Sequence, residues 1–354
     1  MGRTARKLAA LTVLLGTLVV ATGVPAGATG PDYAPLDRPG PALSVPRADL
    51  AAALSCHGDL RGSALQPVLL VPATSVTPEQ NYSWNWEPAF AAQKRPWCTV
   101  TMPFQTLGDI QTVGEYLVFA IREVHRQAGR KIAVMGHSQG GMSMRWALRF
   151  WPDTRPMVDD VIGMAGDNHG TTLLDPVCVE GFTTCTPQGW QQRSTSAFIE
   201  ALNSRSETFA GISYTEIYSR TDEVVLPSTG AKPSSALTGP GRITNVATQS
   251  ICALDVYEHL TVGTVDPVTY ALATDALNHD GPAQASRISR SVCLQPFMPG
   301  VNPLDLANNL RTLSIVGALP HLLLVPAPFI NLAGAPQLGK EPALRCYVLA
   351  AGCR

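Results

Sequence analysis

The chain has 354 residues, of which 45% are hydrophobic and 15% are charged. With 26 basic and 27 acidic side chains, its formal net charge is −1. This balance excludes the strongly basic surface typical of nucleic-acid-binding proteins and the charge runs that bind polyelectrolytes. The composition indicates a globular protein with a large core, and the length suffices for one large α/β domain.

The first 28 residues have the pattern of a secretory signal peptide. Three basic residues precede an apolar run from Leu8 to about Val24, and an A-x-A-type cleavage site ends at Ala28. We predict that residues 1–28 are removed, that residues 29–48 form an extended arm, and that residues 49–354 form a single domain. From about residue 295, we expect a helical or irregular appendage. No other uninterrupted apolar run is long enough to cross a bilayer, so we expect a secreted protein without stable membrane insertion.

Eight cysteines follow the expected leader, which indicates an oxidising compartment. Zinc is the alternative, but the sequence has no C-x-x-C and no paired Cys/His spacing, so we expect no metal. Nothing in the sequence indicates an organic cofactor. Short spacing suggests two disulfides, and we pair the other four cysteines in chain order, although the sequence alone does not choose among the many connectivities. The expected bonds are Cys178–Cys185, Cys346–Cys353, Cys56–Cys98 and Cys252–Cys293.

Short apolar runs alternate with segments of helical period from Gln66 onward. The expected strands span residues 68–71, 99–102, 131–135, 158–165, 214–218 and 243–246. The expected helices span residues 112–126, 141–150 and 195–203. Such alternation predicts an α/β fold with a mostly parallel sheet and helices on both faces.

The strongest chemical signal is the G-x-S-x-G segment from Gly136 to Gly140. An expected strand runs into it and an expected helix runs out of it. In this context a sharp turn lifts the serine Oγ clear of the sheet, and glycines are needed because a Cβ would collide with neighbouring backbone. The alternative is an ordinary glycine-rich turn with an inert serine. The strand–turn–helix context favours Ser138 as a catalytic nucleophile.

A serine nucleophile needs a base, and the base needs an orienting acid. In folds with this turn the partners follow in the order serine, acid, histidine. Asp222 follows the expected strand 214–218 and is the candidate acid. Its neighbour Glu223 is an alternative. Asp167 also follows an expected strand, 158–165, but this strand is the one before 214–218.

Three histidines follow the candidate acid: His259, His279 and His321. His259 comes soonest, one short strand after the acid, but chain order alone does not settle the choice. A tetrahedral intermediate also needs hydrogen-bond donors for its oxyanion. The candidates are the backbone N–H of Gln139 and the N–H and hydroxyl of Thr74, which lies in the loop after the first expected strand.

Together these residues resemble the Candida-type lipase B family, as secreted bacterial relatives of that family do. The resemblance spans about residues 65–302. It implies an α/β-hydrolase fold, a catalytic triad of Ser138, Asp222 and His259, and an oxyanion hole of Thr74 and Gln139. The shared segments are Val68-Leu-Leu-Val-Pro-Ala-Thr74, Ser138-Gln-Gly-Gly141, Trp190-Gln-Gln192 and Tyr218-Ser-Arg-Thr-Asp-Glu-Val224.

The resemblance also implies that Asp167 and Gln192 line the acyl pocket, and it supports the two long-range disulfides. Val224, at the end of a shared segment, is a further pocket candidate. His137 replaces the tryptophan that precedes the nucleophile in the family, so we expect it to border the pocket for the leaving alcohol. Ala73 stands where the family has glycine. The Cys178–Cys185 bond is an added feature.

We therefore predict a secreted, monomeric lipase or carboxylesterase that cleaves lipid-like esters through an acyl-enzyme, with a lipid–water interface as a candidate site of action. An acyltransferase of envelope lipids uses the same intermediate and stays open as an alternative. A serine peptidase is less favoured, because nothing supplies a charged specificity pocket for peptides. A non-catalytic binding protein has no physical reason to keep the complete set of catalytic residues.

Overall fold

The computed structural model describes residues 31–310 and 334–353. The expected signal peptide, His321 and part of the expected C-terminal appendage lie outside these described residues. Within them, the chain from Tyr33 onward clusters as one unit. Helix α1 (Arg47–Ala52) begins inside the segment that was expected to be an extended arm.

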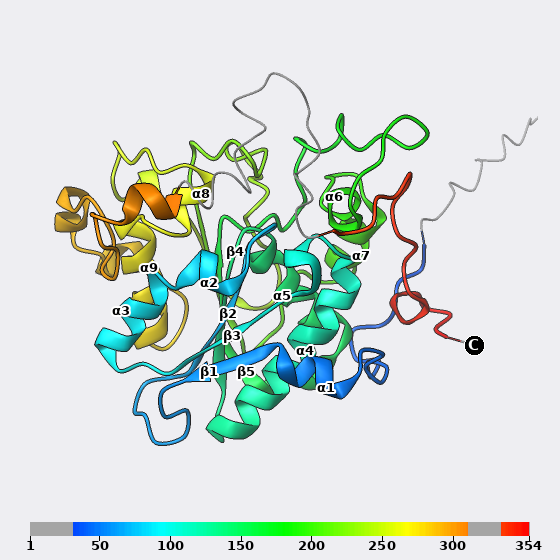
Figure 1. Ribbon diagram of the computed structural model, residues 1–354, viewed down its shortest axis with the longest axis horizontal. Coiled ribbons are helices and arrows are strands. Elements are labelled where there is room, and N and C mark those ends of the chain that lie inside the picture. Colours follow the sequence, from blue (N-terminus) through cyan, green and yellow to red (C-terminus); the bar gives the residue numbers. More distant parts are fainter. Residues whose placement is uncertain (1–30, 311–333, 354) are drawn as a thin grey trace, which may run out of the picture. The chain divides into compact units, whose positions relative to one another are not determined.

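A seven-stranded sheet forms the centre of this unit (Figure 1). Its spatial order is β1-β3-β2-β4-β5-β6-β7, and every neighbouring pair is parallel except β1, which runs antiparallel to β3 at the edge. The mostly parallel sheet confirms the predicted α/β class. The strands are β1 (Leu54–His57), β2 (Val68–Val71), β3 (Trp97–Val100), β4 (Ile132–His137), β5 (Val158–Met164), β6 (Ser213–Tyr218) and β7 (Arg242–Ala247).

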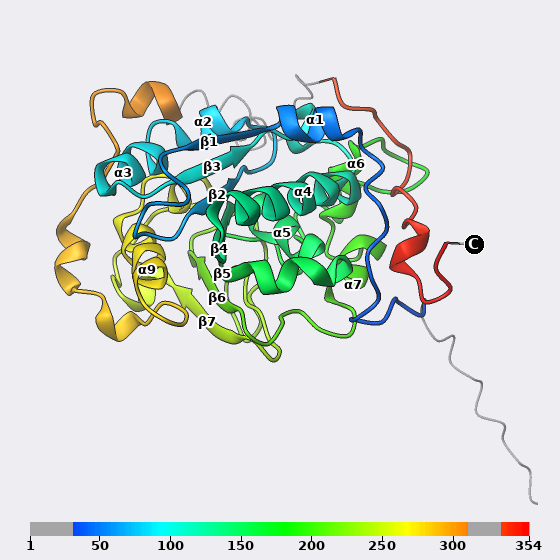
Figure 2. The ribbon, with the colours of Figure 1, turned by 90° about the horizontal axis from the view of Figure 1, so that it is seen from below.

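Helices cover both faces of the sheet, as predicted. In β2, Leu69 and Val71 contribute to one hydrophobic core while Val68 and Leu70 contribute to the other, as expected for a strand buried on both faces. Figure 2 shows α4 (Ile110–Ala128), α5 (Gln139–Phe150) and α7 (Ala197–Asn203) on one side, and α3 (Trp86–Gln93) and α9 (Pro267–Asn278) on the other. The shorter helices are α2 (Pro78–Tyr82), α6 (Pro187–Gln191) and α8 (His259–Val262).

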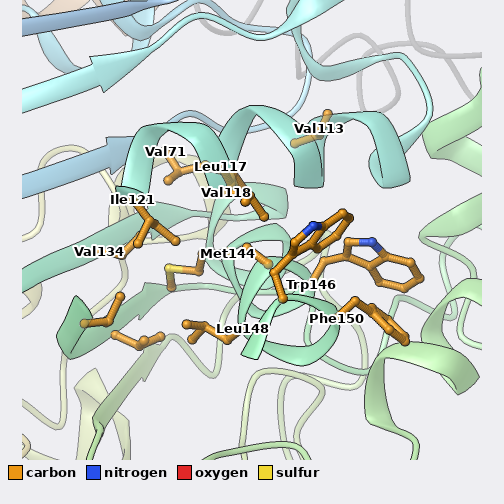
Figure 3. Packing of buried hydrophobic residues seen from close by; sticks show 14 of the residues in the cluster. Val71, Val113, Leu117, Val118, Ile121, Val134, Met144, Trp146, Leu148 and Phe150 are labelled. Atoms are coloured by element: carbon orange, nitrogen blue, oxygen red, sulfur yellow. The ribbon is translucent and has the colours of Figure 1, made fainter. Parts of the chain in front are cut away.

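The core beneath α4 and α5 fixes the helix that follows the expected nucleophile (Figure 3). All twelve residues of α5 are buried. The indole of Trp146 stacks on Phe198 with ring centroids 4.3 Å apart. Gly114 of α4 makes room for that indole, because a Cβ there would lie 2.4 Å from it. Helix α5 therefore has little freedom to shift relative to the sheet.

Some elements differ from the sequence-based expectation. The second expected strand, residues 99–102, lies two residues earlier, at β3. The edge strand β1 was not predicted, because its residues are half-buried or exposed and carry no continuous apolar run. Helices α3 and α9 were not predicted either. Helix α9 is alanine-rich, and it buries residues around most of its circumference rather than along one stripe.

Four disulfides join the cysteines in the expected pairs. The Cys56–Cys98 bond links the edge strand β1 to β3. The Cys252–Cys293 bond ties the segment before α8 to the chain beyond α9. Across residues 31–310 and 334–353, no helix combines the length and hydropathy needed to span a membrane.

Candidate active site

The turn between β4 and α5 places Ser138 in a strained backbone conformation, with φ 54° and ψ −126°. The flanking glycines make this turn possible. A Cβ on Gly136 would lie 2.3 Å from the carbonyl carbon of Gly140, and a Cβ on Gly140 would lie 2.2 Å from the carbonyl oxygen of Val71. The Ser138 N–H donates to the Met164 carbonyl at 2.8 Å. The turn therefore has the shape that the G-x-S-x-G pattern predicts.

Ser138, His259 and Asp222 form a continuous chain of hydrogen bonds. The distance from Ser138 Oγ to His259 Nε2 is 2.9 Å, and the distance from His259 Nδ1 to Asp222 Oδ2 is 2.8 Å. The other carboxylate oxygen of Asp222 accepts from the backbone N–H groups of Val224 and Val225, at 2.9 and 2.8 Å. All three side chains are buried. The structure thus brings together the three residues expected to form the triad.

The alternative triad candidates among the described residues do not take part in this chain of hydrogen bonds. His279 contacts Asp275, at 3.2 Å, at the end of α9. The Glu223 carboxylate accepts from the backbone N–H of His259 at 3.4 Å rather than from the imidazole ring. Asp167 lines the cavity beside Ser138 and contributes no hydrogen bond to His259.

The surroundings of the His259 imidazole change its affinity for a proton. Burial of the ring disfavours its charged form, but the charge of Asp222 and the hydrogen bond to it outweigh this effect and raise the pKa of His259. Glu223 and Glu258 raise the pKa further through their charges. In the neutral ring, Nδ1 carries the proton and donates a hydrogen bond to Asp222. The lone pair of Nε2 is then left facing the Ser138 hydroxyl.

On the other side of Ser138, the expected oxyanion residues are joined through their side chains. The Thr74 hydroxyl donates to Gln139 Oε1 at 2.8 Å. Gln192 Nε2 donates to the same two residues, at 3.1 Å to Thr74 Oγ1 and 3.2 Å to Gln139 Oε1. Gln139 is also the first residue of α5, where backbone N–H groups have no acceptor within the helix. Its N–H is therefore not used by the hydrogen bonds of the helix, which is what an oxyanion donor requires.

A cavity opens in front of Ser138 and His259. His137, Asp167, Gln192 and Val224, the four expected pocket residues, all contribute to its lining. Most of the remaining wall is apolar, which suits an acyl chain or another lipid-like group. The other lining residues are Ala73, Thr74, Val76, Asn81, Thr171, Leu173, Leu174, Val225 and Leu260.

Asp167 is an unusual member of this wall. Its carboxyl group is buried, and burial raises its pKa to about 7. Within the described part of the chain, its Oδ1 atom has no hydrogen-bond partner. A protonated carboxyl group in this position can donate a hydrogen bond to a bound ligand.

Sequence reasoning missed several pocket residues. Asn81 comes from α2, and Thr171, Leu173 and Leu174 come from the loop after β5. No motif marks these positions, and Asn81 reaches the site only because α2 packs against the end of β2. Among the residues that the structure describes, no group of three or more His, Cys, Asp or Glu side chains is arranged to hold a metal ion.

Comparison with known proteins places the chain in a family. A family model described as lipase (class 2) matches residues 109–261. Lipase B from Pseudozyma antarctica is 33% identical over 311 residues, which cover 87% of this chain and 86% of that protein. The crystal structure of Aspergillus fumigatus lipase B has a TM-score of 0.75 and 31% identity, covering 88% of this chain and 74% of that one. The chain therefore belongs to the lipase B family and is a lipase-type hydrolase with the α/β-hydrolase fold.

Proposed function

We propose that this chain is a secreted lipase or carboxylesterase that cleaves lipid-like esters through an acyl-enzyme on Ser138. The observation that carries the proposal is the continuous contact chain from Asp222 through His259 to Ser138, with distances of 2.8 and 2.9 Å. This series of contacts ends at the cavity, so the serine hydroxyl faces the space that a substrate would occupy. Such a set is the minimal machinery for acyl transfer by a serine.

In the first half of the reaction, Ser138 Oγ attacks the ester carbonyl carbon while His259 Nε2 takes the hydroxyl proton. Asp222 keeps the ring in the required tautomer and stabilises the imidazolium that forms. When the tetrahedral intermediate collapses, the bond to the alcohol oxygen breaks. His259 then gives its proton to the leaving alcohol, and the acyl group remains on Ser138.

The developing oxyanion receives hydrogen bonds from the backbone N–H groups of Thr74 and Gln139 and from the Thr74 hydroxyl. Such donors stabilise charge that is present only in the transition state and intermediate, so they accelerate the chemical step. In the second half of the reaction, His259 takes a proton from water as the water attacks the acyl carbonyl. The carboxylic acid leaves and Ser138 regains its proton.

The apolar wall favours esters with a hydrocarbon acyl chain. Leu173, Leu174 and Val224 offer no charged group for a peptide side chain. Asp167 and Gln192 add polar atoms on the acyl side, where a carbonyl or ether oxygen can bind. Lipid esters therefore fit the cavity better than peptides do.

We also propose that the protein acts outside the cell as a monomer, with a lipid–water interface as its working site and without a metal or organic cofactor. The four disulfides support secretion, because such bonds persist mainly in oxidising compartments. The pattern of residues 1–28 supports the same destination.

The proposal is tested with p-nitrophenyl esters and triglyceride emulsions over a range of acyl-chain lengths. The wild type should hydrolyse these esters, and Ser138→Ala should lower kcat by about 10⁶, as removal of a triad serine does elsewhere. Thermal unfolding should show that the variant keeps its fold. Ester turnover by Ser138→Ala at the wild-type rate would contradict the assignment.

A further inference from the structure

Beside the nucleophile, in the wall of the cavity, lies a buried series of polar contacts that the proposed mechanism does not use. It consists of the side chains of Asn81 and His137, which are 0% and 1% exposed. The backbone N–H of Ala73 contacts Asn81 Oδ1 at 2.8 Å. Asn81 Nδ2 lies 3.4 Å from His137 Nδ1, and His137 Nε2 lies 3.0 Å from the backbone carbonyl oxygen of His259.

The two ends of this chain fix the direction of every hydrogen bond. A backbone carbonyl only accepts, so His137 Nε2 carries a proton and donates to His259. In a neutral ring Nδ1 is then an acceptor, which the NH₂ group of Asn81 satisfies. That orientation of the amide leaves Asn81 Oδ1 to accept from the N–H of Ala73. Each of these contacts pairs a donor with an acceptor.

The surroundings of His137 hold its ring in this state. Burial lowers the pKa of His137 to about 3, so the ring is neutral at working pH. Gly263, just after α8, lies against the ring, because a Cβ there would be only 2.3 Å from His137 Cδ2. The carbonyl of Gly263 accepts from the indole N–H of Trp86 at 2.9 Å, which fixes that wall of the site.

Helix α2 anchors the same region through a second residue, Tyr82. Its hydroxyl donates to the carbonyl of Val71 at 2.6 Å and accepts from the backbone N–H of His137 at 3.2 Å. Helix α2 is therefore tied to the ends of two strands. The end of β2 leads into the loop that carries Thr74, which we call the oxyanion loop, and the end of β4 leads into the turn that carries Ser138.

We propose that Asn81 and His137 form a positioning relay that sets His259 and the oxyanion loop relative to Ser138. Each contact of the relay involves a residue that is adjacent to, or identical with, a residue of the proposed machinery: Ala73 precedes Thr74, His137 precedes Ser138, and His259 is the base. The inference rests on the proposed function of Ser138 and His259. The relay acts through backbone placement, so it affects the chemical step more than ester binding.

The test compares three single variants of the relay, the double variant His137→Phe/Asn81→Leu and one control variant. His137→Phe keeps a ring but removes both hydrogen bonds, and Asn81→Leu keeps a similar volume but breaks the link to Ala73. His137→Gln carries both an amide oxygen and an NH₂ group, so it can accept from Asn81 and donate to the carbonyl of His259. His279→Phe, at the remote end of α9, is the matched control and should keep the wild-type kcat.

We expect His137→Phe and Asn81→Leu to lower kcat by about ten- to a hundredfold, since small misplacements of catalytic groups have effects of this size. KM should change by less than about twofold, and the loss should be equal for ethyl esters and bulky-alcohol esters. The double variant should be no slower than the slower single variant, because both changes break one chain. His137→Gln should recover most of kcat, and the proton NMR signal of His259 Nδ1–H should move in the two impaired variants only.

A folded His137→Phe variant with the wild-type kcat would overturn the relay. So would additive losses in the double variant, or losses that depend on the size of the alcohol. If His137→Phe does not fold, Asn81→Leu alone decides, because it leaves the imidazole in place. Ser138→Ala, assayed in parallel, separates the two proposals: a dead Ser138→Ala with a fully active Asn81→Leu refutes the relay and leaves the proposed function intact.

Discussion

In the proposed mechanism, the two sides of Ser138 are prepared for reaction in different ways. On the base side, Asp222 is fixed by two backbone N–H groups and holds His259 in place, so proton transfer needs no rearrangement. On the oxyanion side, the Thr74 hydroxyl donates to the side chain of Gln139. That hydroxyl must turn away from Gln139 before it can donate to an oxyanion.

Under this proposal, the site combines rigid groups with one group that can turn. The backbone donors of the oxyanion side are fixed by α5 and by the loop after β2, which Thr106 ties down through its contacts with Ala73 and Ser75. In the proposed mechanism, only the Thr74 hydroxyl changes the acceptor to which it donates. Gln192 can keep Gln139 Oε1 satisfied when that happens, because its Nε2 atom already contacts it at 3.2 Å.

The largest expected effect breaks the base side at its acid. Asp222→Asn should lower kcat by about 10⁴, because an amide no longer stabilises the required tautomer or the imidazolium. Glu223→Gln, the neighbouring control, should stay within about tenfold of the wild type, because Glu223 contacts the backbone of His259 and not its ring. Steady-state kinetics on a p-nitrophenyl ester measure both variants. The reverse ranking would refute Asp222 as the acid.

A smaller loss should follow from removing the adjustable hydroxyl. Thr74→Val should lower kcat by about a hundredfold, the order found when one oxyanion donor is removed from a related type of site. Thr74→Ser keeps the hydroxyl and should remain near the wild-type rate. If both variants were equally active, the oxyanion would be served by backbone donors alone, and the contrast between the two sides would disappear.

The pH dependence of kcat/KM tests the base side in a second way. Because the pKa of His259 is raised, its ring stays protonated, and therefore inactive as a base, up to a higher pH than an ordinary histidine does. The kcat/KM of the wild type should therefore fall as pH decreases through a midpoint above 6.5, the usual value near which imidazole titrates. Glu223→Gln removes one of the charges that raise this pKa, so its midpoint should shift to lower pH. A midpoint at or below that of free imidazole, or no shift in the variant, would contradict this account.

The smallest expected effect concerns the leaving alcohol. An imidazole is smaller and more polar than an indole, so the alcohol pocket beside His137 should be roomy and should accept bulky alcohols. His137→Trp should lower the ratio of kcat/KM for bulky-alcohol esters to that for ethyl esters by severalfold relative to His137→Phe, which shares the loss of hydrogen bonds. Equal ratios in the two variants would show that position 137 does not shape the pocket.

Much of the fold could be predicted from local patterns. Strands β2, β4, β5 and β6 are short runs buried on both faces, and such runs stand out from the helical segments between them. Edge strand β1 could not be predicted in this way, because only its pairing with β3 and the Cys56–Cys98 bond define it.

Some residues of the site could likewise be predicted from local patterns, and others could not. Ser138 was marked by the glycines that its turn needs, and chain order limited the acid and the base to a few candidates. The family resemblance was needed to choose His259 over His279. Asn81 could not be predicted at all, since its position depends on where α2 packs, and a lone asparagine in a polar segment carries no chemical signal.

The most direct test of the central claim is covalent labelling with a fluorophosphonate, followed by peptide mapping. We expect one adduct per chain, on Ser138, and labelling that is slowed by several orders of magnitude in His259→Ala but not in His279→Ala. An adduct on another serine, or labelling of His259→Ala at the wild-type rate, would contradict the assignment of Ser138 and His259 as nucleophile and base.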